Sequence, residues 1–329
     1  MMDAPRPQLG DIQAAAGRLS GFAVRTPLLE SPLLNQQLGG RLLVKPECLQ
    51  LTGSFKFRGA FNKISQLTPD ELERGVIAFS SGNHAQGVAA AAHMKGTQAV
   101  IVMPKDAPRI KIDNTRAWGA EVVTYDRHGD DREAVTAKLQ AERGLILVPP
   151  FDDYDIISGQ GTVGLEIADQ CEEKELVPDA VSVCCGGGGL SAGSAIALSS
   201  RFEDCKFHTA EPEGWDDTAQ SLACGARVRL EETPASICDA LMAPAPGEQT
   251  FAINRELYNS GVVVSEQEVI DAMATALAIF KIVVEPGGAV ALASVLSGHV
   301  PIEGRTVVAI VSGGNVDPEL FTQLLSRAS

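Results

Sequence analysis

The chain of 329 residues is 45% hydrophobic and 21% charged, which is typical of a globular protein of about two domains and excludes a largely disordered chain. Its 27 basic and 42 acidic residues give a formal net charge of −15, which argues against nucleic acid or an anionic membrane surface as a partner, and no stretch reaches the roughly 18 apolar residues of a membrane span. Because the N-terminus lacks the features of a signal peptide and the seven cysteines form no CxxC pair, we predict a cytoplasmic protein with free thiols.

Short runs rich in Val and Ile alternate along the chain with Ala-rich segments of helical period. The predicted strands are 41–45, 76–79, 99–103, 121–125, 145–148, 180–185, 206–210 and 306–311. The clearest predicted helices are 84–94, 131–142, 190–200 and 266–282. This alternation favours right-handed crossovers and mostly parallel, twisted sheets flanked by helices, so the predicted fold class is α/β.

Two domains are predicted from the order of these elements. The segment 75–150 carries four strands in succession and forms a small domain that gates the substrate, inserted into a larger domain made of 1–74 and 151–329. Three strands end in turns rich in Gly or Ser, at 80–84, 186–189 and 312–315. Ligands of open α/β sheets bind at the carboxyl ends of strands, so we expect the three turns to converge on one site.

Lys56 is the first candidate for chemistry. It lies between a polar turn and a predicted helix start, with Phe55 and Phe57 on either side. Aromatic neighbours would partly desolvate the amine and lower its pKa toward that of a nucleophile that forms a Schiff base. The alternative, and the commoner situation for a single lysine, is a surface residue at a helix N-terminus.

The turn 80–84 places two hydroxyls, an amide and an imidazole around the free N–H groups of a predicted helix start. Its polar residues are Ser80, Ser81, Asn83 and His84. This set suits a carboxylate, and one hydroxyl can serve as a general acid or base. The alternative is an N-cap cluster in which His84 only caps or packs.

Four consecutive glycines, Gly186, Gly187, Gly188 and Gly189, follow a predicted strand and precede a helix of small residues. Glycines let backbone N–H groups turn toward an anion, and a helix N-terminus adds a favourable partial charge, so the predicted ligand is a phosphate. No Gly-Lys-Ser/Thr follows, which excludes a P-loop. The alternative is a tight turn that only brings the strand and helix close together.

Taken together and in this order, the segments 54–60, 80–87, 186–189 and 312–315 resemble the serine/threonine dehydratase and serine racemase family. These are pyridoxal-phosphate enzymes of fold type II, the fold of the tryptophan synthase β subunit. The resemblance extends from about Thr26 to Asp317. Cysteine synthases and threonine synthases usually carry Asp directly after the lysine, where this chain has Phe57.

The resemblance implies a role for each motif. Lys56 would bind pyridoxal phosphate as a Schiff base and later remove the α-proton, and Phe55 would pack against the pyridine ring. Asn83 would bond the ring's 3-oxygen, the four glycines would hold the phosphate, and Ser312 would face the ring nitrogen. A neutral serine there leaves that nitrogen unprotonated, which favours β-elimination.

The same resemblance places the substrate α-carboxylate on the turn 80–84. The residues implied are Ser80, Ser81, Asn83 and His84. In racemases of this family the second serine delivers a proton to the face opposite the lysine. Ser81 therefore makes amino-acid racemisation an alternative to dehydration, although dehydratases also carry this serine.

A structural metal is a further expectation from the family. Members that bind a divalent cation use Glu, a backbone carbonyl and Asp at positions that match Glu211, Trp215 and Asp217. Oxygen ligands of this kind suit Mg²⁺, with Ca²⁺ or Mn²⁺ as alternatives. The residues alone also fit a capping cluster, because acids are favourable near a helix N-terminus.

Two features bear on the substrate. The loop 236–244 replaces a family glycine by Ala240 and is less polar than usual, which argues against plain serine/threonine specificity. Arg132 matches an arginine that in related racemases contacts the distal carboxylate of a dicarboxylate ligand, and hydroxyaspartate dehydratases carry a similar Asp-Arg-Glu run. The alternative for Arg132 is an exposed first-turn arginine paired with nearby acids.

We therefore predict a pyridoxal-phosphate dependent ammonia-lyase that eliminates the β-hydroxyl of 3-hydroxyaspartate or of L-serine/L-threonine and yields a 2-oxo acid and ammonia. The alternative within the fold is a serine or aspartate racemase. An alternative of another class is a non-catalytic protein that binds a phosphate or nucleotide at the glycine turns. The family also implies a homodimer.

Overall fold

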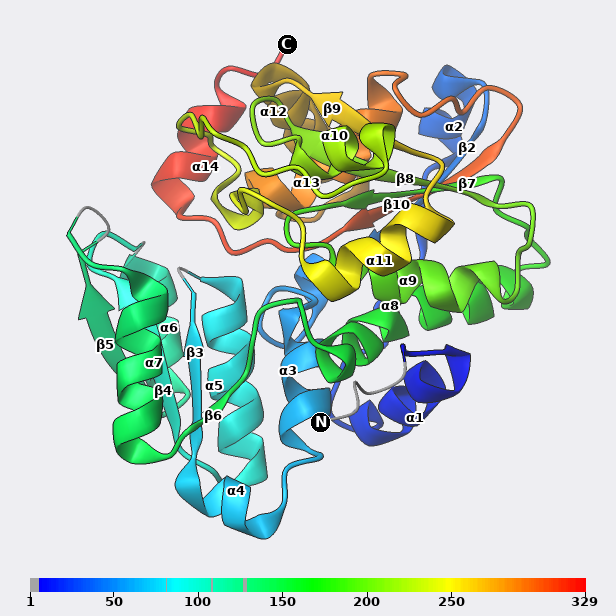
Figure 1. The fold of residues 1–329 in the computed structure, drawn as a ribbon. Coiled ribbons are helices and arrows are strands. Elements are labelled where there is room, and N and C mark those ends of the chain that lie inside the picture. Colours follow the sequence, from blue (N-terminus) through cyan, green and yellow to red (C-terminus); the bar gives the residue numbers. More distant parts are fainter. Residues whose placement is uncertain (1–5, 81, 108, 127–128) are drawn as a thin grey trace.

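Residues 6–80, 82–107, 109–126 and 129–329 are described by the structure, a computed structural model of the chain. Two mostly parallel sheets lie side by side, each flanked by helices (Figure 1). The larger sheet has the order β1-β2-β10-β7-β8-β9, with β1 (Leu29–Glu30), β2 (Arg41–Pro46), β7 (Ala180–Cys184), β8 (Lys206–Pro212), β9 (Ser260–Val264) and β10 (Thr306–Val311). The smaller sheet has the order β5-β4-β3-β6, with β3 (Val76–Phe79), β4 (Ala99–Pro104), β5 (Glu121–Tyr125) and β6 (Ile146–Leu147).

Strand pairing brings distant parts of the chain into the larger sheet. β2 and β10 pair in parallel from Arg41↔Thr306 to Pro46↔Val311. The residues of β10 after Thr306 are all aliphatic and buried, as expected for a central strand covered on both faces, and β2 has the aliphatic run 42–44 at its centre. Only the short β1, among the paired strands described, runs antiparallel to its neighbour. The strands of the smaller sheet all come from one continuous stretch between Val76 and Leu147.

Helices occupy most of the remaining chain. In chain order they are α1 (Leu9–Leu19), α2 (Pro32–Leu38), α3 (Lys56–Ile64), α4 (Pro69–Arg74), α5 (Asn83–Lys95), α6 (Arg109–Ala117), α7 (Arg132–Arg143), α8 (Tyr154–Glu173), α9 (Gly189–Ser199), α10 (Asp217–Cys224), α11 (Glu248–Leu257), α12 (Glu266–Thr275), α13 (Pro286–Leu296) and α14 (Pro318–Leu325). Two 3₁₀ turns, η1 (Glu47–Leu49) and η2 (Asp239–Leu241), and one π-helical turn, η3 (Ala276–Phe280), complete the set. None of the helices in the described ranges combines the length and apolar character that a membrane crossing requires.

Helices cover both faces of the larger sheet, with α8 and α9 on one side and α12 and α13 on the other (Figure 1). α8 and α9 approach closely because both carry glycine where they cross. A Cβ added to Gly161 would lie 2.8 Å from the carbonyl oxygen of Gly193, and one added to Gly164 would lie 2.5 Å from that of Ser194. The predicted α/β class with helix-flanked, mostly parallel sheets is confirmed.

The bounds of most predicted strands and helices agree with the structure to within two residues. Two strands were missed and one helix was predicted too long. The strands β1 and β9 were not predicted. The predicted helix 266–282 is wrong in its last part, because α12 ends at Thr275 and continues as the π turn η3. Lys281 then takes a left-handed conformation with φ of 60°, which ends the helical segment.

A buried ion network fixes α3 against β2 and α8. Arg58 Nε donates to Glu47 Oε2 at 2.7 Å, and Arg58 Nη1 donates to Glu166 Oε1 at 2.7 Å. Lys45 Nζ donates to Glu166 Oε2 at 2.6 Å. The side chains of Lys45, Glu47 and Arg58 are at most 1% exposed. This network anchors the first turn of α3, which begins at Lys56.

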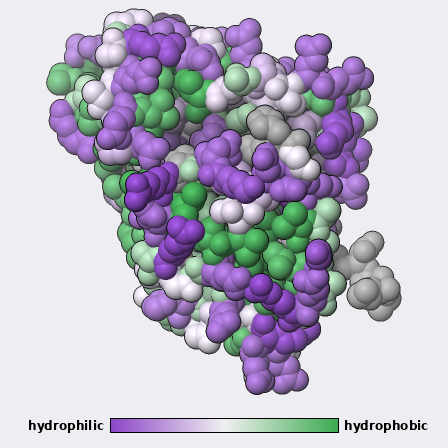
Figure 2. All heavy atoms as spheres, turned by 90° about the vertical axis from the view of Figure 1, so that its left-hand side faces the viewer, coloured by the Kyte–Doolittle hydropathy of each residue, from purple (hydrophilic) through white to green (hydrophobic). Residues whose placement is uncertain are grey.

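The outer face of the smaller sheet is largely polar. Figure 2 shows the side of the molecule that lies at the left of Figure 1, where hydrophilic residues cover most of the surface and hydrophobic residues gather mainly at mid-height. In the edge strand β5, Glu121 and Thr124 are exposed and only Tyr125 is buried. Charged and polar residues on an exposed edge discourage further strand pairing.

Candidate active site

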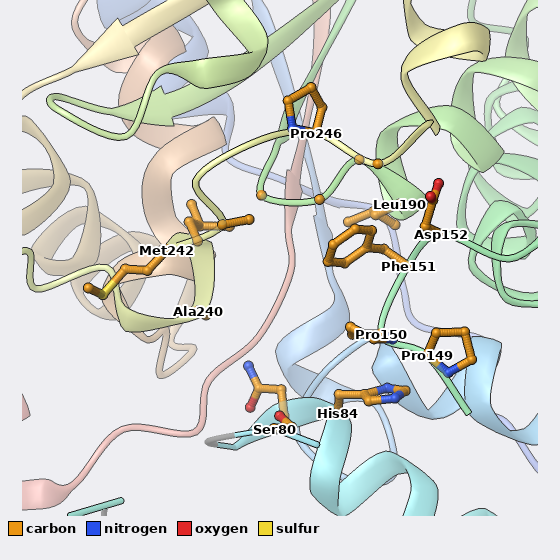
Figure 3. A pocket seen from close by; sticks show the side chains of 18 of the residues that line it. Ser80, His84, Pro149, Pro150, Phe151, Asp152, Leu190, Ala240, Met242 and Pro246 are labelled. Atoms are coloured by element: carbon orange, nitrogen blue, oxygen red, sulfur yellow. The ribbon is translucent and has the colours of Figure 1, made fainter. Parts of the chain in front are cut away.

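A cavity of about 560 Å³ opens where the carboxyl ends of strands from both sheets meet. The turns that follow β3, β7 and β10 all contribute to its wall, through Ser80 and residues 82–84, the glycines 186–189, and Ser312. Figure 3 shows Ser80 and His84 on one side of this cavity, Phe151 and Leu190 across from them, and Met242 and Pro246 along a further wall. The three turns singled out in the sequence thus lie at one site, and Ser81 falls outside the described residues.

Lys56 is the first residue of α3 and lines the cavity. Its Nζ donates to the carbonyl oxygen of Pro150 at 2.7 Å and lies 5.0 Å from the centre of the Phe55 ring. Burial lowers the pKa of Lys56 from 10.5 to about 8. The amine is therefore a far better nucleophile and base near neutral pH than a solvated lysine.

The glycine turn joins β7 to α9 in a space that admits no side chain at its last three glycines, 187–189. A Cβ added to Gly187 would lie 2.2 Å from Cδ1 of Phe151, and one added to Gly189 would lie 2.3 Å from Oε1 of Gln160. Gly188 has a φ of +93°, a conformation that glycine adopts without strain. The turn leads directly into α9, whose first N–H groups have no partners within the helix and can bind an anion.

Asn83 and His84, at the end of the turn 80–84, are each held by hydrogen bonds. Asn83 Nδ2 donates to Glu285 Oε1 at 2.5 Å, and Asn83 Oδ1 accepts from Asn315 Nδ2 at 2.8 Å. His84 Nε2 lies 2.8 Å from the carbonyl oxygen of Val148, so it carries the proton. Burial, and secondarily the charge of Lys56, lowers the pKa of His84 to about 3. The ring is neutral with Nδ1 as an acceptor, so His84 can bind a carboxylate only through its backbone N–H.

A buried ion cluster that the sequence analysis missed lies in the same wall. Lys111 Nζ of α6 donates to Asp239 Oδ2 of η2 at 2.9 Å and lies 3.7 Å from Glu285 Oε2, just before α13. The side chains of Lys111 and Glu285 are 5% and 1% exposed. Burial raises the pKa of Glu285 to about 7, although the charge of Lys111 opposes the shift. Nothing in a single sequence signals a lysine that pairs with acids more than a hundred residues away.

Arg132 begins α7 beside the cavity, with its guanidinium carbon 5.3 Å from the centre of the Phe79 ring. Its neighbour Asp131 caps the helix by accepting from the backbone of Glu133 at 2.8 Å. Arg132 is exposed and forms no ion pair with any residue in the described ranges. Arg132 is thus an exposed arginine in the first turn of α7, as the alternative expects, but without the expected ion pair to an acid among the described residues.

The loop that departs from the family pattern also lines the cavity. Residues 240–246 form part of its wall, and Pro244 accepts a backbone hydrogen bond from Leu230 at 2.8 Å. Gly186 packs against η2, since a Cβ added there would lie 3.4 Å from Cα of Leu241. The loop thus connects the glycine turn to Asp239 and to the ion cluster of Lys111.

The candidate metal ligands lie outside the lining of the cavity. Glu211, at the end of β8, accepts from the backbone of Thr218 at 2.9 Å and of Ala219 at 2.7 Å, and its side chain is buried. Both carboxylate oxygens of Asp217 are buried, and neither has a hydrogen-bond partner among the described residues. Trp215 is also buried, in the turn between these two acids. An unpartnered buried carboxylate beside a second buried acid fits a cation between them.

Comparisons with known proteins identify the family of the chain. A family model described as "Pyridoxal-phosphate dependent enzyme" matches residues 19–313. The L-threo-3-hydroxyaspartate ammonia-lyase of Saccharomyces cerevisiae is 41% identical over 320 residues, which cover 97% of each chain. The crystal structure of a threonine deaminase from T.th. superposes with a TM-score of 0.89 at 44% identity, covering 94% of this chain and 99% of that one. Maize serine racemase superposes with a TM-score of 0.90 at 36% identity and 98% coverage of each.

The match extends over nearly the whole chain and includes the residues of all three turns that line the cavity, up to Ser312. The similar proteins are named as hydroxyaspartate ammonia-lyase, threonine deaminase and serine racemase, which is the group that the four motifs resemble. The chain belongs to the pyridoxal-phosphate dependent enzymes of fold type II, and within them to the serine/threonine dehydratase and serine racemase family.

Proposed function

We propose that this protein is an ammonia-lyase that removes the β-hydroxyl group of 3-hydroxyaspartate and releases a 2-oxo acid and ammonia, with L-serine and L-threonine as poorer substrates. The observation that favours hydroxyaspartate over serine and threonine is the guanidinium group of Arg132. It lies at the cavity and pairs with no acid among the described residues. A second carboxylate is the feature that separates hydroxyaspartate from serine and threonine, and arginine binds carboxylates with two parallel hydrogen bonds. The 41% identical yeast relative, named for hydroxyaspartate, supports the same substrate.

The residues of the cavity fit pyridoxal phosphate. The amine of Lys56 would bind its aldehyde, the Phe55 ring would pack on the pyridine ring, and the N–H groups of 186–189 would surround the phosphate. Asn83 would face the 3-oxygen of the ring, and the hydroxyl of Ser312 would face the ring nitrogen. When bound, the cofactor supplies an electron sink for the charge that develops at Cα of the amino acid.

The chain's own residues carry the proton transfer and the orientation of the substrate. Lys56, with its pKa lowered to about 8, is the base that takes the α-proton. The α-carboxylate binds at the start of α5, where Ser80, Asn83 and His84 line the cavity and the first N–H groups of the helix have no partners within it. Ser81 belongs to the same proposed set. Arg132 then holds the distal carboxylate and directs the β-carbon toward Lys56.

The test is release of 2-oxo acid and ammonia from the stereoisomers of 3-hydroxyaspartate, from L-serine and from L-threonine. We expect hydroxyaspartate to have the highest kcat/KM, and Arg132→Ala to raise KM for hydroxyaspartate at least about tenfold more than KM for serine. Arg109→Ala is the matched control, because Arg109 is also exposed but pairs with Asp113 at 3.5 Å outside the cavity. Equal effects of Arg132→Ala on both substrates would refute the distal-carboxylate role.

Racemisation is the second candidate, favoured by the likeness to maize serine racemase. Chiral analysis of the same reactions decides between the two, since D-amino acid formed as fast as ammonia would make racemisation a principal activity. The non-catalytic alternative predicts that protein purified with added pyridoxal phosphate lacks the visible absorption band of a lysine-bound cofactor. We expect the band to be present.

We also propose that Glu211, the backbone oxygen of Trp215, and Asp217 hold Mg²⁺. The support is the buried carboxylate of Asp217, which has no hydrogen-bond partner among the described residues. Hard divalent cations prefer carboxylate and carbonyl oxygen ligands. Because these residues do not line the cavity, the ion would stabilise the segment between β8 and α10 rather than touch the substrate.

A homodimer is a further proposal, supported by exposed apolar residues. Leu49 and Val283 are 46% and 47% exposed. They come from segments that meet at Gly314, where an added Cβ would lie 2.5 Å from Val283 O and 3.0 Å from Cβ of Cys48, the neighbour of Leu49. Such exposed apolar residues favour a second copy of the chain as their cover. We expect Val283→Glu, but not Leu33→Glu, to lower the mass measured by light scattering.

A cytoplasmic location and the two-domain boundaries also remain proposals. All seven cysteines are free, which supports a reducing compartment. Limited proteolysis near 74 and 150 would test the small domain 75–150.

A further inference from the structure

Lys111 is an enclosed cation that the proposed reaction does not yet use. It comes from α6, beside the smaller sheet, whereas its two partners Asp239 and Glu285 come from segments of the larger sheet's side. Its side chain is 5% exposed although its charged end faces the cavity. A lysine is rarely buried to this degree unless its charge is compensated, and here two carboxylates compensate it.

Two walls of the cavity meet at this lysine. Its stem packs against Gly82, just before α5, because a Cβ added to Gly82 would lie 2.6 Å from Lys111 Cδ. Its Nζ binds Asp239 in η2, the start of the loop that lines the opposite wall. The turn 80–84 is where we propose that the α-carboxylate binds, and the loop borders the substrate side chain. Lys111 therefore connects the two parts of the site that bind one amino acid.

Glu285 extends the connection to Asn83. Its Oε1 accepts from Asn83 Nδ2 at 2.5 Å, while its Oε2 has no hydrogen bond from the described residues and lies 3.7 Å from Lys111 Nζ. An ionised Glu285 can only accept, so it fixes which end of the Asn83 amide faces it. The cation of Lys111 favours that ionised state.

We propose that Lys111 is a positioning residue of this enzyme, whose ammonium group holds the start of α5 at residues 82–84 and η2 at the separation that a bound amino acid requires. The inference rests on the proposed function in that the amino acid binds between these walls. It differs from the role of Arg132 because it concerns every accepted amino acid, not only those with a second carboxylate.

The groups that face this pair come from several elements. Asp239 of η2 faces Lys111, Cys48 of η1 and Cys184 of β7 lie within electrostatic range of Glu285, and Asp317 acts on Lys111 from a greater distance. Burial raises the pKa of both thiols, so Cys48 and Cys184 remain neutral near pH 7. Among the described residues, Lys111 is therefore the positive charge that acts most strongly on Glu285.

The test uses the holoenzyme and compares Lys111→Met with the control Lys138→Met, whose lysine forms an exposed pair with Glu142 in α7. We expect Lys111→Met to raise KM about tenfold for every substrate the enzyme accepts, because a small displacement of a binding wall weakens all of them alike. Cofactor content and its absorption band should stay as in the wild type. The acid limb of kcat/KM should move to higher pH, since Glu285 loses its cation.

Thermal unfolding gives a readout that does not depend on activity. An acid whose pKa is raised in the folded state stabilises the protein less as pH rises through that range. Lys111→Met should therefore lose more Tm between pH 6 and pH 8 than the wild type, and Lys111→Met/Glu285→Gln should fold and lose that dependence. Wild-type KM in Lys111→Met would overturn the proposal. The proposal would also be overturned if Lys111→Met lowered Tm equally at pH 6 and pH 8 and the added Glu285→Gln substitution did not restore any of that Tm. A wild type that releases no ammonia would instead overturn the proposed function and leave the unfolding comparison to decide this inference.

Discussion

Lys56 Nζ donates to the carbonyl oxygen of Pro150 at 2.7 Å, across the base of the cavity and 94 positions away in the chain. Pro150 lies on the segment that leads from the smaller sheet into α8, so the amine is held between the two halves of the molecule. A carbonyl dipole does not compensate a full charge, and burial lowers the pKa of Lys56 to about 8.

The first prediction concerns this amine. In cofactor-free protein, the rate of absorbance change on adding pyridoxal phosphate should rise with pH through a midpoint of about 8, because only the neutral amine attacks the aldehyde. Lys56→Ala should abolish both the absorption band and ammonia release, whereas Lys138→Ala should leave both unchanged. A midpoint at the ordinary lysine value of about 10.4 would show that the amine is solvated.

The second prediction concerns the glycine turn. Gly187→Ala places a methyl group 2.2 Å from the Phe151 ring, so the turn must move and its N–H groups lose their common direction. We expect the Kd for pyridoxal phosphate, measured by fluorescence titration, to rise at least about tenfold, as expected for the loss of one or two charge-assisted hydrogen bonds. Gly10→Ala is the control, because a Cβ at Gly10 of α1 meets nothing within 4 Å. Unchanged affinity in Gly187→Ala would exclude this turn as the phosphate site.

The third prediction concerns the ion network under α3. Glu47→Gln leaves Arg58 buried with only one of its two carboxylate partners. Breaking a buried pair from one side costs about 3–5 kcal/mol, and we expect a loss of this order in the free energy of unfolding by urea. Glu173→Gln is the control: its exposed pair with Arg25 should contribute at most about 1 kcal/mol.

The pH dependence of this network has a definite sign. Burial alone would raise the pKa of Glu47, but the charge of Arg58 keeps this pKa below its usual value. Its contribution to stability is therefore present above the ordinary glutamate pKa and is lost as pH falls through the lowered value. Glu47→Gln should be less sensitive to acid than the wild type, and an identical acid unfolding midpoint in both would contradict this account.

The fold and the main site residues were accessible from sequence because their signals are local. The strands before the turns 80–84 and 186–189 can be recognised from their runs of apolar residues, and the turns from the Gly and Ser residues that follow. The same turns carry the family motifs, so resemblance and physical reasoning point to the same residues. The α/β class and the positions of most strands along the chain follow from these patterns.

What the sequence could not predict depends on contacts between distant segments. Lys111 and Asp239 are 128 positions apart, and no period or motif marks either as half of a buried pair. The acceptor state of His84 Nδ1 likewise follows from one carbonyl, that of Val148, which only the folded chain brings within 2.8 Å. The two-residue strand β1 offers too short a pattern to detect, and it exists because β2 provides an edge to pair with.

The fourth prediction concerns the metal. If Mg²⁺ binds at Glu211, Trp215 and Asp217, it links the end of β8 to the first turn of α10 and compensates the unpartnered buried carboxylate of Asp217, so its removal should destabilise the fold. We expect a chelator to lower Tm, and Mg²⁺ at about a hundred times its Kd to restore about 2.7 kcal/mol of stability. Asp217→Asn should remove the response to Mg²⁺ because it removes a charged ligand.

Asp216→Asn is the matched control for that experiment, since Asp216 is adjacent but its carboxylate accepts from Gln220 at 3.2 Å on an exposed surface. It should keep the full response to Mg²⁺. A loss of the response in both variants would point to the general negative charge of this segment rather than to a coordination site. No change in Tm with chelator, together with no metal in elemental analysis, would mean that Asp217 is buried without a cation, where burial raises its pKa to about 7.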